Sequence, residues 1–134
     1  MKIDFELAHL PDRLLRMFCD PMKEAGRMKA PTFAEHFHHA MNRELTRRAE
    51  FLPALDEPFE LPDPPENEMP WVIVEFRKLG DGFEQMAADL RESHPSDPKS
   101  VREYDAEQAG RFEATAKFCH AIAVACKNEP LLNS

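Results

Sequence analysis

The sequence predicts an all-α fold, a single bundle-like domain over residues 1–134 with about four main helices. Only four glycines occur in 134 residues, which argues against an architecture rich in β-hairpins. Two long segments carry apolar side chains at alternating spacings of four and three, the pattern of packed helices. A chain of this length can bury a hydrophobic core without disulfides or a structural metal.

The N-terminal part, residues 1–52, is expected to hold an extended segment and two helices. Apolar residues alternate from position 3 to position 7, which predicts a short strand or an extended clip on the core. One apolar face then predicts a helix over about 10–26, interrupted at Asp20 because a residue before proline avoids the α conformation. Thr32 and Glu35 form a capping-box pattern, which predicts a helix from Thr32 to about Leu52.

Residues 53–69 form an acidic, proline-rich connector. Between positions 50 and 70 there are seven acidic residues, six prolines and no basic residue. This proline density disfavours both helix and sheet, so we expect an extended, polyproline-like segment. Three apolar side chains offer anchors to the core: Leu55, Phe59 and Leu61.

Residues 70–134 are predicted to form an antiparallel helical hairpin with a short tail. One apolar seam consists of Val72, Phe76, Leu79, Phe83, Met86 and Leu90, and the other of Gln108, Phe112, Thr115, Cys119, Ile122 and Cys126. The seams predict helices over about 70–93 and 98–127, joined by a turn. We expect Phe83 or Phe76 to pack against Phe112 or Cys119. A break at Gly80 is the alternative for the first helix.

Four residues of one helix raise the question of a metal site or an acid–base site: Glu35, His36, His38 and His39. At 100° per residue, His36 and His39 point away from the apolar stripe, whereas His38 lies at its edge. The histidines therefore do not converge, and helix-borne metal sites draw further ligands from other helices. We expect no metal, no cofactor and no catalytic residues.

Charge and cysteine content narrow the class of protein. A net charge of −8 disfavours direct binding to nucleic acid and to anionic membranes. No apolar run is long enough for a membrane span and no secretory signal is apparent, so we expect a cytoplasmic protein. Cys119 and Cys126 lie seven apart on one predicted helix, too far for a disulfide, which fits a reducing compartment.

The function expected from these features is a non-enzymatic protein–protein interaction module, such as an adaptor, inhibitor or assembly subunit. It would engage a basic partner surface, one form of this being acidic mimicry of nucleic acid, and a homodimer is possible. The expected contact residues are Glu57, Phe59, Glu60, Leu61, Asp63, Glu66 and Glu68. One alternative is that the connector folds back on Arg43, Arg47 and Arg48. Another is a metal-binding bundle or enzyme that uses the group at positions 35–39.

Overall fold

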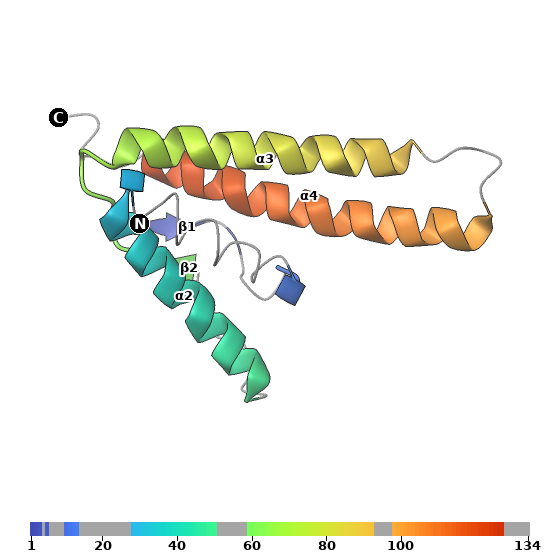
Figure 1. The fold of residues 1–134 in the computed structure, drawn as a ribbon, viewed down its shortest axis with the longest axis horizontal. Coiled ribbons are helices and arrows are strands. Elements are labelled where there is room, and N and C mark those ends of the chain that lie inside the picture. Colours follow the sequence, from blue (N-terminus) through green and yellow to red (C-terminus); the bar gives the residue numbers. More distant parts are fainter. Residues whose placement is uncertain (4, 6–9, 14–27, 51–58, 93–97, 128–134) are drawn as a thin grey trace.

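The computed structural model describes residues 1–3, 5, 10–13, 28–50, 59–92 and 98–127 (Figure 1). The predicted all-α class is confirmed, because this part of the chain is mostly helical. The elements are β1 (Lys2–Ile3), α2 (Pro31–Ala49), β2 (Phe59–Glu60), α3 (Met69–Arg91) and α4 (Lys99–Lys127). The helix expected over 10–26 and the tail after 127 lie largely outside the described residues, so the count of four helices stays a prediction.

Helices α3 and α4 lie side by side along most of their length (Figure 1). Asp81 contacts His120, whereas Arg91, later in α3, pairs with Glu113, earlier in α4. The two helices are therefore antiparallel. The expected contact between Phe83 and Phe112 is present as a stacked pair with ring centroids 5.9 Å apart. α3 is one continuous helix, as predicted, and the alternative, a break at Gly80, does not occur.

The buried stripe of α3 departs from the predicted seam. Met86 is 51% exposed, and its place in the interior is taken by Ala87. The buried positions are Met69, Val72, Phe76, Gly80, Phe83 and Ala87. Their mean spacing matches the roughly 3.6 residues per turn of a straight α-helix and not the 3.5 of a heptad, so the stripe stays on one face along α3. On α4 the seam is deeply buried from Thr115 to Cys126.

A cluster of four aromatic rings joins α2 to the helix pair. The Phe76 ring contacts those of Phe33 and Phe37 at centroid distances of 5.6 and 5.5 Å. Phe37 also contacts Phe118 of α4 at 6.2 Å, and all four side chains are almost completely buried. Beyond this cluster, the second half of α2 diverges from α3 and α4 (Figure 1). The core is therefore concentrated where α2 and α3 begin and α4 ends.

The N-terminal segment forms a strand, one of the two forms expected for it. β1 pairs antiparallel with β2, with Lys2 opposite Glu60 and Ile3 opposite Phe59. The Ile3 side chain is completely buried, which attaches the strand pair to the core. The prediction that the connector avoids sheet structure is wrong at β2. Its two residues lie between Pro58 and Pro62 and keep their own N–H groups, so the prolines flank the pairing without blocking it.

The start of α2 differs from the predicted capping box. The helix begins at Pro31, which suits the first helical position, and Ala30 is the N-cap residue. Thr32 therefore lies inside the helix, and the N-cap residue makes no side-chain hydrogen bond. The Glu68 carboxylate supplies the cap instead. Its Oε1 accepts the Phe33 N–H at 2.9 Å and its Oε2 accepts the Thr32 N–H at 3.3 Å.

We predict that Glu68→Ala lowers the free energy of unfolding by about 1–2 kcal/mol, the usual effect of losing an N-cap acceptor. Thr32→Ala is the matched control and should stay within about 0.5 kcal/mol of the wild type, because its side chain is exposed and caps nothing. Urea unfolding followed by circular dichroism measures both. Equal losses for the two variants would show that the local capping box forms after all.

Candidate functional site

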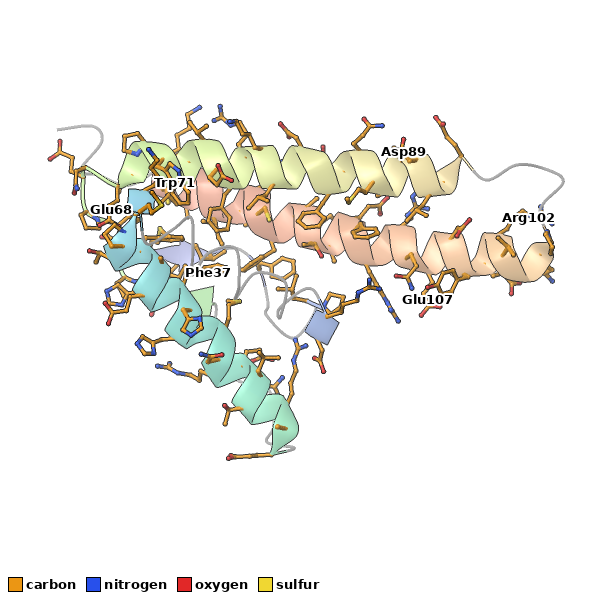
Figure 2. The ribbon with its side chains drawn as sticks, viewed as in Figure 1. Phe37, Glu68, Trp71, Asp89, Arg102 and Glu107 are labelled. Atoms are coloured by element: carbon orange, nitrogen blue, oxygen red, sulfur yellow. The ribbon has the colours of Figure 1, made fainter. Side chains whose placement is uncertain are left out.

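The structure divides the seven predicted contact residues of the connector. Glu57 lies outside the described residues, and Phe59 is described only by its backbone in β2. Leu61 and Glu68 are buried, at 2% and 3% exposure. Leu61 belongs to the core and Glu68 caps α2 beside the start of α3 (Figure 2). These two side chains stabilise this chain and are not available at its surface.

The remaining three predicted residues are exposed, and we call them the acidic ridge: Glu60, Asp63 and Glu66. The amino group of Met1 pairs with Asp63 at 2.8 Å and also donates to the Leu61 carbonyl at 2.6 Å. Glu60 lies opposite Lys2 in the strand register. Pro64 is buried between these exposed positions, so the ridge is fixed to the core by residues that alternate with its acids.

Arg47 and Arg48, near the end of α2, form hydrogen bonds with acidic side chains and with a backbone carbonyl of this chain. Glu44 accepts from Arg47 at 2.9 Å and from Arg48 at 3.0 Å. The hydrogen bond from Arg47 is the main cause of a lowered pKa of Glu44; burial opposes it and Arg48 reinforces it. Arg48 also pairs with Asp12 and donates to the Leu10 carbonyl. The hypothesis that the connector folds back on these arginines also involves positions 51–58, which lie outside the described residues.

The histidine group on α2 does not form a joint site. The Nε2 atom of His38 lies 3.0 Å from the side-chain amide nitrogen of Asn42, one turn along the helix. His39 lies 3.9 Å from Glu35, and both side chains are about 70% exposed. Within the part of the chain that the structure describes, Glu35, His36, His38 and His39 do not bring three ligand atoms together.

A different cluster forms between the two long helices. His120 of α4 lies against α3, with Nε2 3.0 Å from Asp81 Oδ1 and Nδ1 3.5 Å from Glu84 Oε1. The His120 side chain is 30% exposed, and the two carboxylates are 68% and 61% exposed. Among the described residues, these three are the group whose ligand atoms all lie within 4.8 Å of one another.

Gly80 makes room for this histidine. A Cβ atom at position 80 would lie 2.3 Å from His120 Cδ2 and 2.4 Å from Nε2, closer than atoms can approach. At Gly82 a Cβ atom would meet nothing within 4 Å. The ring is therefore seated on the bare backbone of α3. The sequence analysis missed this cluster because its residues come from two helices and no local spacing pattern joins them. A glycine on the inner face of a heptad-like helix was the available signal.

The neighbouring thiol offers no nucleophile. Cys119 is completely buried, and burial raises its pKa to about 12. A thiolate is the reactive form, so this side chain is inert at neutral pH. Cys119 and Cys126 do not form a disulfide with each other, as expected from their spacing.

Comparison of the chain with models of known protein families, with curated proteins and with solved structures finds no match. No helix in the described ranges is both long enough and apolar enough to cross a lipid bilayer.

We predict opposite behaviour for two neighbouring glycines. Gly82→Ala should raise the free energy of unfolding by up to about 1 kcal/mol, because alanine favours a helix and the position is open. Gly80→Ala should be at least about 1 kcal/mol less stable than Gly82→Ala, because the new methyl group displaces the His120 ring.

Chemical denaturation of both variants measures this difference, and the His120→Ala background is its control. Without the ring, the two alanine substitutions should become equivalent. A difference that persists in the His120→Ala background would mean that Gly80 serves helix packing independently of the histidine.

Proposed function

We propose that this protein is a non-enzymatic protein–protein interaction module, an adaptor, inhibitor or assembly subunit, that binds a basic surface of a partner protein through its acidic ridge. The observation that supports the proposal is the alternation along residues 60–66. Leu61 and Pro64 are buried, whereas Glu60, Asp63 and Glu66 are exposed. The acids are presented on a segment that is already attached to the core.

Attachment of the segment favours binding because less conformational entropy is lost when the partner docks. The prolines at positions 62, 64 and 65 also restrict the backbone, which further lowers the conformational entropy lost on binding. A net charge of −8 adds long-range attraction for a positive surface, which speeds association and makes it sensitive to salt. One form of this function is mimicry of nucleic acid, in which the ridge occupies a partner surface that otherwise binds phosphates.

The proposal has a cellular and an architectural part. It assigns the protein to the cytoplasm, and the absence of a disulfide between Cys119 and Cys126 is consistent with a reducing compartment. It also includes a bundle completed by a fourth helix over residues 10–26. Leu10 is almost completely buried and residues 12 and 13 are helical, which supports a packed helix that begins here.

The alternative function, a metal-binding protein or enzyme based on positions 35–39, has less support because those side chains do not converge.

The test is a charge reversal on the ridge. We expect Glu60→Lys/Glu66→Lys to weaken capture of the native partner from cell extract, mainly through slower association, while the thermal unfolding temperature changes little. These two side chains are exposed, and the anchors Leu61 and Glu68 remain intact. Binding of the wild type should weaken steeply between 50 and 200 mM salt, roughly the range over which exposed charges become screened.

The matched control makes the same charge change at the other end of α3, with Asp89→Lys/Glu92→Lys (Figure 2). This variant should retain the partner that the ridge variant loses. Equal loss of partner capture in both variants would show that binding depends on the total charge of the protein and not on the ridge. Unchanged capture by the ridge variant would contradict the proposed function, and a fall in unfolding temperature would instead assign the ridge to stabilising this chain.

Self-association is a second part of the proposal. Met86, Val101 and Tyr104 are between 42% and 59% exposed on α3 and α4, in the halves of the helices nearest their connection. A second copy could cover these side chains through a self-complementary interface. We expect sedimentation at micromolar concentration to show a dimer that Met86→Lys/Tyr104→Lys disrupts. A single species of 15.4 kDa for the wild type would contradict this part.

A further inference from the structure

We propose that Asp81, Glu84 and His120 bind a divalent transition-metal ion of the zinc type and that this ion links α3 to α4. The site is separate from the acidic ridge and does not depend on the proposed interaction function. Two ligands come from one helix and one from the other, so the three meet only in the folded chain.

The positions of the ligand atoms suit one ion. Ligand atoms bound to zinc at about 2.0–2.2 Å lie at most about 4.4 Å apart. The three ligand atoms here lie within 4.8 Å of one another, so only small side-chain movements are needed. Asp81 and Glu84 are three residues apart and therefore share a face of α3. Both carboxylates are more than 60% exposed, which gives them freedom to adjust and leaves coordination positions open to water.

The seat of the histidine is an independent indication of a built site. Glycine in the middle of a helix is less favourable than alanine by about 1 kcal/mol. Gly80 nevertheless occupies the buried stripe of α3, and its missing side chain is the space that the His120 ring fills. Packing thus holds the ring against α3 and aims its polar edge at the two carboxylates.

The charges also favour a divalent ion. In the structure each ring nitrogen faces a carboxylate, at 3.0 Å for Asp81 and 3.5 Å for Glu84. Only a protonated ring can donate to both at once, and its single charge balances only one carboxylate. A divalent ion bound to Nε2 would replace that proton and balance both. Asp81 already lies beside Nε2, so the more distant Glu84 is the ligand that must turn.

The donor set selects the class of metal. One imidazole nitrogen with two carboxylate oxygens suits zinc, cobalt or nickel. Magnesium and calcium prefer oxygen ligands alone. Because the ion bridges two helices, it stabilises the folded state over the unfolded state in proportion to its occupancy.

The test uses the full chain, without a histidine tag and freed of metal by a chelator. We expect titration with Zn²⁺ to show one site per chain and Co²⁺ to give a visible absorption band with bound imidazole. Zinc at ten times its dissociation constant should raise the unfolding temperature by roughly 5 °C. Asp81→Asn/Glu84→Gln should weaken zinc binding at least about tenfold. Both side chains are exposed, so this variant should keep its helical circular dichroism; Glu84→Gln alone is the milder variant should the pair unfold.

The control is His36→Gln/His39→Gln, which removes the other closely spaced histidines and should leave affinity and stoichiometry unchanged. Loss of binding in this control would place the metal on α2 and overturn the proposal. Wild-type affinity in Asp81→Asn/Glu84→Gln would overturn it as well. So would the absence of zinc binding to the folded wild type at millimolar concentration, which would leave His120 as a histidine that only pairs with Asp81 and Glu84.

Discussion

The carboxylate of Glu68 links the starts of α2 and α3, two of the three helices that build the core. It lies immediately before α3 and accepts two backbone N–H groups in the first turn of α2. An ionised group with 3% exposure would be strongly unfavourable without such partners. The first turn of a helix supplies them, because its N–H groups lack partners within the helix and its dipole favours negative charge. The start of α2 is thereby held against the start of α3, although 35 residues separate Glu68 from Phe33.

The aromatic cluster lies directly beneath this contact. Phe33 takes part in both, since its N–H donates to Glu68 while its ring packs edge-on against Phe76. Polar and apolar contacts thus act at the same residue. The far half of α2 diverges from the helix pair and is held by a different set of contacts (Figure 1). There Arg48 connects Glu44 on its own helix to Asp12 and to the Leu10 carbonyl in the N-terminal segment.

Local periodicity was sufficient to predict α3 and α4 but not the contacts between distant polar groups. The apolar spacing of α3 and α4 predicted their extents and the contact of Phe83 with Phe112, because helix packing follows from the faces of each helix. The cap at Glu68 could not be predicted in this way. Thr32 offered a complete local motif, and only the tertiary fold shows that a carboxylate from another segment takes that role. His120 was missed for the same reason, since its two partners lie 36 and 39 residues earlier in the chain.

The acidic residues show why composition alone could not identify the site. Glu44 and Glu68 are buried and stabilise this chain, through arginines in one case and backbone N–H groups in the other. Asp81 and Glu84 face a histidine that a glycine admits to the helix surface. Glu60 and Glu66 differ from all of these, because Leu61 and Pro64 between them are buried while both glutamate side chains are exposed to solvent. A carboxylate that remains exposed on an attached segment can interact with another molecule without loss of the fold. The acids of the ridge can therefore bind a partner without destabilising the chain. Glu68 cannot, because its carboxylate is needed to cap α2.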